Sequence, residues 1–152
     1  MSLMRIVLLV GLPGSGKSTW LARMGGGGIS SDAIRGLLAD DQGDQTVNHR
    51  VFQTVRYLLR QRLRIGRSVT VIDATNLTPA ERAPYIAIGK SFGCQVEAVF
   101  FDVPLEVCIE RHQRRDRVVP EDVMRRMAAK LKAPAFDEGF AKITVVRVKK
   151  KD

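Results

Sequence analysis

The chain of 152 residues has little of what marks membrane-spanning, secreted or metal-thiolate proteins. Its only two cysteines, Cys94 and Cys108, form neither a C-x-x-C pair nor a metal-ligand spacing, so both are expected as small packed thiols. No apolar run is long enough to cross a bilayer. The short run Ile6 to Val10 leads into glycines, not into a signal-peptide cleavage site. These absences predict a reduced, cytoplasmic protein with no membrane partner.

Acidic residues are outnumbered, with 16 Asp and Glu against 25 Lys and Arg, a net charge of +9 and a pI of about 10.2. Such an excess favours phosphorylated or nucleic-acid partners. The arginines gather in two segments. These comprise Arg56, Arg60, Arg62, Arg64 and Arg67, and then Arg111, Arg114, Arg115, Arg117, Arg125 and Arg126.

Short β-branched and leucine-rich runs alternate with segments of helical periodicity. The expected strands are 5–10, 29–30, 68–73, 95–103 and 142–148, and the expected helices follow the glycine-rich loop and then cover 32–39, 47–65, 79–92, from 104, and 120–131. This alternation predicts an α/β architecture with a mostly parallel five-stranded sheet and helices on both faces. No repeat or dividing linker is visible, so residues 4–152 are expected to form one domain, with 1–3 set aside as a possible cloning remnant.

The segment "GLPGSGKS", Gly11 to Ser18, matches G-x-x-x-x-G-K-[ST] in full, after a buried strand and before a helix. Its glycines let backbone N–H groups surround phosphates, Lys17 would reach the β- and γ-phosphates, and Ser18 would ligate Mg²⁺. The motif predicts a three-layer P-loop NTPase fold that binds ATP and Mg²⁺. The expected nucleotide-binding residues are Gly11, Pro13, Gly14, Ser15, Gly16, Lys17, Ser18 and Thr19.

A second metal-side carboxylate is expected at Asp73, which ends the strand "TVID" at the edge where ligands of parallel sheets bind. The alternative is that Asp73 caps the following helix. Thr78, directly before Pro79, is better placed for that capping, which favours the metal-side role.

The segment "SSDAIRG" places Asp32 and Arg35 one turn apart, just past the second strand. Asp32 is a candidate base for an acceptor hydroxyl, and Arg35 is a candidate for gripping a substrate phosphate. The alternative is structural: Ser31 or Asp32 would be the N-cap of this helix and have no catalytic duty.

An arginine-rich segment is a candidate lid that closes over the transferred phosphate. Arg111 and Arg115 have the i, i+4 spacing of one helix face, and Arg114 and Arg117 flank them. A solvated basic helix end remains the alternative.

Three other side chains are assigned to structural positions. His112, within the same segment, is expected on the surface. His49 is expected at an exposed helix start, and Trp20 in the core.

The motifs "GLPGSGKST", "SSDAIRG", "DDQGDQT", "VIDATN" and "VCIERHQRRDR" together resemble the polynucleotide 5′-kinase domain of bacterial RNA end-healing enzymes. They resemble the phage polynucleotide kinase more loosely. The resemblance covers about Arg5 to Val148. It implies a general base at Asp32, binding of an acceptor phosphate at Arg35, and ATP and magnesium contacts at Lys17 and Ser18. It also implies lid arginines over the ATP phosphates, at Arg111, Arg115 and Arg117.

The sequence as a whole favours a kinase that moves the γ-phosphate of ATP to a hydroxyl, most simply the 5′-OH end of a nucleic acid. No N-K-x-D stretch follows a later strand, which argues against guanine specificity. Two alternatives stay open. One is a small-molecule or sugar-nucleotide kinase of the zeta-toxin type, and the other is an ATP-dependent regulatory module that hydrolyses ATP slowly without an acceptor.

Overall fold

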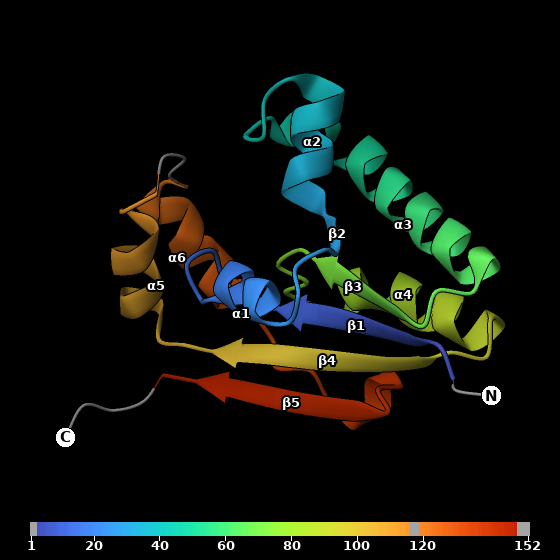
Figure 1. The fold of residues 1–152 in the computed structure, drawn as a ribbon. Helices are drawn as coiled ribbons and strands as arrows, with labels where there is room; N and C mark the ends of the chain where they lie inside the picture. Colours follow the sequence, from blue (N-terminus) through green and yellow to red (C-terminus); the bar gives the residue numbers. More distant parts are fainter. Residues whose placement is uncertain (1–2, 116–118, 149–152) are drawn as a thin grey trace.

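The computed structural model describes residues 3–115 and 119–148 and contains one five-stranded sheet. The strand order is β2-β3-β1-β4-β5, and every neighbouring pair is parallel. The arrowheads of β1, β3, β4 and β5 point the same way in Figure 1. This confirms the predicted parallel sheet. The strands are β1 (Arg5–Val10), β2 (Ile29–Ser30), β3 (Val69–Asp73), β4 (Gln95–Asp102) and β5 (Lys142–Arg147).

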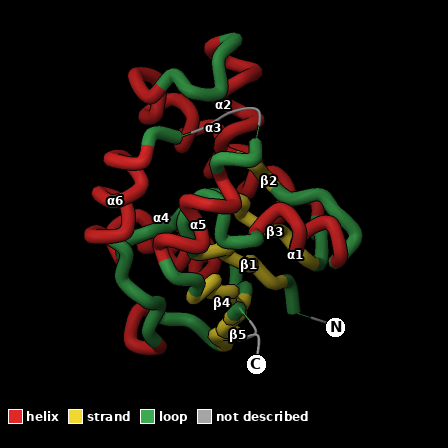
Figure 2. Tube along the Cα trace, turned by 90° about the vertical axis from the view of Figure 1, so that its left-hand side faces the viewer, coloured by secondary structure: helices red, strands yellow, loops and turns green. Residues whose placement is uncertain are grey.

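Helices cover both faces of the sheet and complete the three layers that the sequence predicts (Figure 2). One core lies under α3 and α4 and includes Leu59 and Tyr85; the other lies under α1, α5 and α6 and includes Cys108 and Met124. The helices are α1 (Lys17–Arg23), α2 (Ser31–Ala39), α3 (Asn48–Ile65), α4 (Pro79–Ser91), α5 (Leu105–His112) and α6 (Glu121–Lys130), with 3-10 turns η1 (Gln45–Val47) and η2 (Phe136–Glu138).

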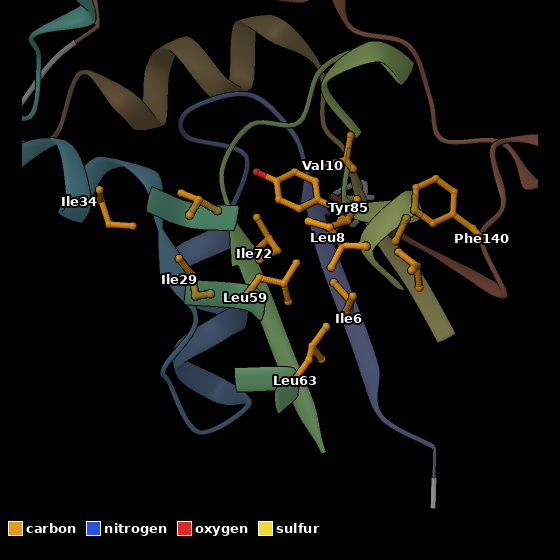
Figure 3. Packing of buried hydrophobic residues seen from close by; sticks show 14 of the residues in the cluster. Ile6, Leu8, Val10, Ile29, Ile34, Leu59, Leu63, Ile72, Tyr85 and Phe140 are labelled. Atoms are coloured by element: carbon orange, nitrogen blue, oxygen red, sulfur yellow. The ribbon is translucent and has the colours of Figure 1, made fainter. Parts of the chain in front are cut away.

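The central strand β1 is apolar throughout because it is buried on both faces. Ile6, Leu8 and Val10 point into the core under α3 and α4, whereas Val7 and Leu9 point into the other core. Figure 3 shows Ile6, Leu8 and Val10 packed with the side chains of the neighbouring elements. Burial of each such side chain contributes about 1.5–3 kcal/mol. The loop that follows β1 therefore begins at a strand that is held firmly by both cores.

Helix ends follow local chemistry. Thr78 caps α4 by accepting a hydrogen bond from the Glu81 N–H, as the sequence predicts. The cap of α2 is Ser30, whose hydroxyl accepts from the Ala33 N–H at 3.1 Å. The alternative that Ser31 or Asp32 is the N-cap is therefore wrong, and the Asp32 carboxylate is available for another role.

Two expectations about the arginine-rich segment are also wrong. His112 is buried, at 3% exposure, because its Nε2 accepts a hydrogen bond from the Val119 N–H at 2.7 Å. Helix α5 ends at His112, so Arg115 lies beyond the helix and does not share a helix face with Arg111. The chain turns at this point instead of continuing the helical period.

The other structural assignments hold. Trp20 packs edge-on against Phe101, with ring centroids 6.1 Å apart, and His49 is exposed near the start of α3. Both cysteines are free thiols, Cys108 buried and Cys94 partly so. Among the residues described, no helix is both long enough and apolar enough to cross a membrane.

Candidate functional site: a phosphate cradle at the carboxyl edge of the sheet

The loop between β1 and α1 has a backbone that only glycine accommodates at two points. Gly14 and Gly16 have φ angles of +81° and +105°. A Cβ on Gly14 would lie 2.4 Å from the Cys108 carbonyl oxygen, so this loop packs directly on α5. These conformations are those of a tight glycine-rich loop, a kind of loop whose backbone N–H groups can surround phosphate groups.

Within the loop, the Ser15 hydroxyl is buried and has no hydrogen-bond partner among the described residues. It faces Gly11, where an added Cβ would lie 2.6 Å from the Ser15 oxygen. A buried hydroxyl without a partner is costly, and an oxygen-rich ligand would satisfy it.

Lys17, the first residue of α1, folds back over this loop. Its ammonium donates a 2.6 Å hydrogen bond to the Gly11 carbonyl oxygen. Burial lowers the pKa of Lys17 to about 8, and the nearby carboxylates of Asp73 and Asp32 oppose that shift. A cation that is poorly solvated and held beside the loop is suited to bind a phosphate.

The sheet register brings the two candidate carboxylates to the same edge. Asp73 ends β3 and pairs with Ser30 of β2, so Asp32 follows two residues beyond its strand neighbour. Burial raises the pKa of Asp73, the Lys17 ammonium opposes this, and Asp32 adds to it. Lys17, Asp73 and Asp32 thus interact at the carboxyl edge of the sheet, where open parallel sheets bind ligands.

Asp32 is held by a partner that is almost entirely buried. Arg35 Nη1 donates to Asp32 Oδ1 at 2.7 Å, with the Arg35 side chain 5% exposed and that of Asp32 52% exposed. On its other side, Arg35 donates from Nε and Nη2 to Asn48 Oδ1, at 3.1 and 2.9 Å. The Asn48 amide in turn donates to Gln45 Oε1 at 2.9 Å. The buried guanidinium of Arg35 therefore fixes the half-exposed carboxylate of Asp32.

The candidate lid arginines differ in where they lie. The Arg111 guanidinium is 4.0 Å from the position a Cβ on Gly16 would take, so it reaches the phosphate loop. Burial has the largest effect on the pKa values of Lys17 and Asp73, lowering the first and raising the second, and the positive charge of Arg115 acts to lower both, so this charge lies near the site. Arg114 points elsewhere and pairs with Glu110 at 3.0 Å on the surface. Arg117 lies outside the described residues.

Two residues that sequence reasoning missed support the floor of the site. Asn76, at φ +47°, donates from its side-chain amide to the Leu9 carbonyl oxygen at 2.7 Å. The fully buried Arg82 donates to the Asn76 carbonyl oxygen and pairs through two hydrogen bonds with Glu138. Asn48 was missed as well. Of these three residues, only Asn76 has a local reason for its identity, because asparagine tolerates the left-handed backbone conformation found there.

The available ligands suit magnesium better than a transition metal. The Ser18 hydroxyl lies in the first turn of α1, and the Asp73 carboxylate lies at the end of β3, where its charge acts on the neighbouring Lys17. Within the described residues, no group of three or more His, Cys, Asp or Glu side chains forms a metal cage. Mg²⁺ is usually coordinated by only a few protein oxygens, and phosphates and waters complete its coordination shell.

A family model described as an AAA domain (AAA_33) matches residues 6–134. The chain belongs to this family. The match begins in β1 and includes the phosphate loop, the Asp32–Arg35 pair, Asp73 and the arginine-rich segment.

Individual relatives share the fold at low identity. A gluconokinase from Sinorhizobium meliloti 1021 has a TM-score of 0.63 and 20% identity, over 99% of this chain and 86% of that one. A fungal RNA kinase has a TM-score of 0.63 and 15% identity, over 100% and 78%. In sequence, 91% of the chain aligns at 31% identity with the Arabidopsis thaliana transcription factor bHLH140, of which it spans 15%. The α/β fold with a parallel sheet is thus shared with P-loop kinases.

Proposed function

We propose that the chain is a kinase that transfers the γ-phosphate of ATP to a hydroxyl group. One observation carries the proposal: the sheet register brings Asp73 and the segment with Asp32 to the carboxyl edge of the sheet, next to the phosphate loop that holds Lys17. A hydrolase needs the phosphate cradle and a metal-side carboxylate. The additional carboxylate at Asp32 is half exposed and fixed by Arg35, which suits it to receive an acceptor.

The ATP side of the site would be formed by the phosphate loop and the groups around it. Lys17 would bind the β- and γ-phosphates, and backbone N–H groups of the loop would surround them. Ser18 and Asp73 would hold Mg²⁺, which, when bound, neutralises phosphate charge. Arg111 and Arg115 would stabilise charge on the transferred group. Arg117 is proposed for the same role from sequence alone.

On the acceptor side, Asp32 would orient the attacking hydroxyl and accept its proton. The acceptor oxygen forms a bond to the γ-phosphorus, the bond to the β–γ bridging oxygen breaks, and ADP leaves. Arg35 would act through Asp32. Its guanidinium is buried and already bonded to Asp32 and Asn48, so fixing the carboxylate suits it better than gripping an acceptor phosphate.

The acceptor that we propose is the 5′-OH end of a polynucleotide. The net charge of +9 supports an anionic acceptor. The motif set around Asp32, Asp73 and the arginine-rich segment resembles that of polynucleotide 5′-kinases. The similar fold of a fungal RNA kinase is consistent with an RNA acceptor. The need for ATP and the two free thiols support a cytoplasmic location.

A second candidate acceptor is a small polyhydroxylated molecule. The burial of Arg35 favours it, because the proposed phosphate-binding group is not open to solvent. The gluconokinase of similar fold is consistent with such an acceptor.

Transfer from [γ-³²P]ATP to a panel of acceptors tests both candidates. The panel contains 5′-OH oligonucleotides, their 5′-phosphorylated counterparts, and polyols including gluconate. We expect label on the 5′-OH oligonucleotides alone. Label on a polyol would replace the proposed acceptor by the second candidate. If no acceptor accelerates ADP release, the kinase proposal is refuted and the chain is better described as an ATPase module.

A further inference from the structure

Helix α3 carries an unusual distribution of charge. It contains Arg50, Arg56, Arg60, Arg62 and Arg64, and no Asp or Glu. Arg62 has a structural role, since it donates to the Thr70 hydroxyl at 3.0 Å and to the Val69 carbonyl oxygen at 2.8 Å. Within residues 3–115 and 119–148, the other four arginines form no ion pair.

The arginines of α6, by contrast, form ion pairs with acidic side chains. Arg125 pairs with Glu106 at 3.1 Å and with Glu121 at 3.4 Å, and Arg126 pairs with Asp122 at 3.1 Å. An ordinary solvated helix intersperses both signs in this way, because i, i+4 pairs of opposite charge stabilise it and like pairs destabilise it. Arg56, Arg60 and Arg64 repeat at i, i+4 and i+8 with like charge. An anionic ligand along this face would remove that repulsion.

The same face carries an exposed aromatic ring. Gln53, Thr54, Arg56, Tyr57 and Arg60 lie on neighbouring turns of α3 and form one open surface patch. The Tyr57 ring is 60% exposed and so is open to a ligand. Arginines beside an exposed aromatic ring suit single-stranded nucleic acid, because the cations can bind phosphates and the ring can stack on a base.

The position of α3 connects this face to the proposed acceptor site. Asn48, its first residue, bonds to Arg35, which holds Asp32. The helix then runs away from α2 toward the opposite end of the sheet (Figure 1). At 1.5 Å per residue, Arg56 lies about 12 Å along the axis from Asn48, and Arg64 about 24 Å. A chain whose end lies at Asp32 would reach these arginines only if it were several nucleotides long.

We propose that the outer face of α3, formed by Gln53, Arg56, Tyr57, Arg60 and Arg64, binds the body of a single-stranded polynucleotide. The inference rests on the proposed function for its direction, since the 5′ end would lie at Asp32. It adds a length-dependent binding surface outside the catalytic centre.

The test compares two variants of equal charge in the full chain. Arg56→Gln/Arg60→Gln removes the α3 arginines, and Arg125→Gln/Arg126→Gln is the control on α6. The probe is a 12-nucleotide oligouridylate with a 5′-OH and a 3′-fluorescein, followed by anisotropy over a range of salt concentrations. We expect the α3 variant to bind about tenfold to a hundredfold more weakly, with a salt slope reduced by about 1.4, or about 0.7 for each lost phosphate contact. The control should bind as the parent does.

Acceptor length gives a second measurement. The α3 variant should raise the KM for the 12-nucleotide acceptor and leave transfer to a dinucleotide unchanged. Tyr57→Leu should weaken binding with an unaltered salt slope, since stacking releases no counterions. Circular dichroism melting should show that each variant is folded.

Several results would overturn the inference. These are equal binding by the α3 variant and the parent, equal weakening in the α6 control, and a loss confined to duplex DNA or phosphatidylserine vesicles. The proposed function fails separately: α3-dependent binding of the oligonucleotide without transfer would refute the kinase assignment and retain the surface. Transfer to the 12-nucleotide acceptor with the same KM in the parent and the α3 variant would refute the α3 surface and retain the kinase assignment.

Discussion

The guanidinium of Arg35 donates two hydrogen bonds to a single oxygen, Oδ1 of Asn48, at 3.1 and 2.9 Å, while its third group holds Asp32 at 2.7 Å. Arg35 is thus fixed by α3 on one side and fixes the proposed base on the other. Substitutions along this chain of contacts separate a catalytic role for Asp32 from a structural one.

Asp32→Asn should reduce transfer by about 10² to 10⁴ while ATP affinity stays near normal, because asparagine keeps the size of the side chain but accepts a proton poorly. Since the cap of α2 is Ser30, stability should change little. Steady-state transfer and separate nucleotide titrations measure the two effects. Unchanged turnover would leave the acceptor side without a base.

Asn48→Ala should lower kcat and destabilise the fold by about 1–3 kcal/mol, because the buried Arg35 loses the acceptor of two hydrogen bonds. Asn48→Asp keeps an oxygen at this position and should retain most of both properties. Urea unfolding and transfer kinetics for the two variants give the comparison. Equal behaviour of Ala and Asp would show that Asn48 does not position Arg35.

Nucleotide binding should take up a proton above about pH 8. In the free protein the pKa of Lys17 is about 8, lowered from 10.5 chiefly by burial. Bound phosphates favour the charged form and raise this pKa, so the affinity should fall as the pH rises through 8. Calorimetry at pH 8.5 in buffers of different ionisation enthalpy measures the uptake. Lys17→Ala should abolish it and cost about 10² to 10³ in transfer rate; proton uptake that persists in this variant would assign the proton to another group.

Magnesium removal by a chelator should stop transfer, and Ser18→Ala should raise the Mg²⁺ concentration needed for half-maximal rate. The reason is that Ser18 and Asp73 offer the only protein oxygens proposed for the ion. Titration of Mg²⁺ at saturating ATP measures the shift. Transfer without any divalent ion would refute both assignments.

Arg82→Leu should lower the free energy of unfolding by about 3–5 kcal/mol, since it leaves Glu138 unpaired and removes the donor to the Asn76 carbonyl oxygen. Arg5→Leu is the matched control. Its pair with Glu97 spans 3.2 Å, but Arg5 is 43% exposed, so the loss should be about 1 kcal/mol or less. Urea denaturation of both variants tests the difference. Similar losses would mean that burial does not set the strength of these pairs.

The strands, most helix bounds and the phosphate loop could be predicted because they depend on residues close in sequence. Apolar runs, glycines at positive φ and the cap at Thr78 are local signals. The contacts of Arg35 with Asn48 and of Arg82 with Glu138 span 13 and 56 residues and arise only when helices pack. The prediction that His112 is exposed was wrong for a similar reason. Its neighbours in sequence are polar and rich in arginine, and they give no sign that the chain turns and buries this imidazole.

The central position of β1 has a consequence for how the protein is made. β1 precedes both of its sheet neighbours in the chain, since β3 and β4 begin at Val69 and Gln95. An emerging chain therefore carries the complete "GLPGSGKS" motif long before the strand that presents it has any partner. The first 66 residues should not bind nucleotide, and the phosphate loop should acquire its shape only after Asp102 has left the ribosome. Such long-range pairing is intrinsically slow, so the most recognisable part of this sequence is among the last parts of the molecule to become functional.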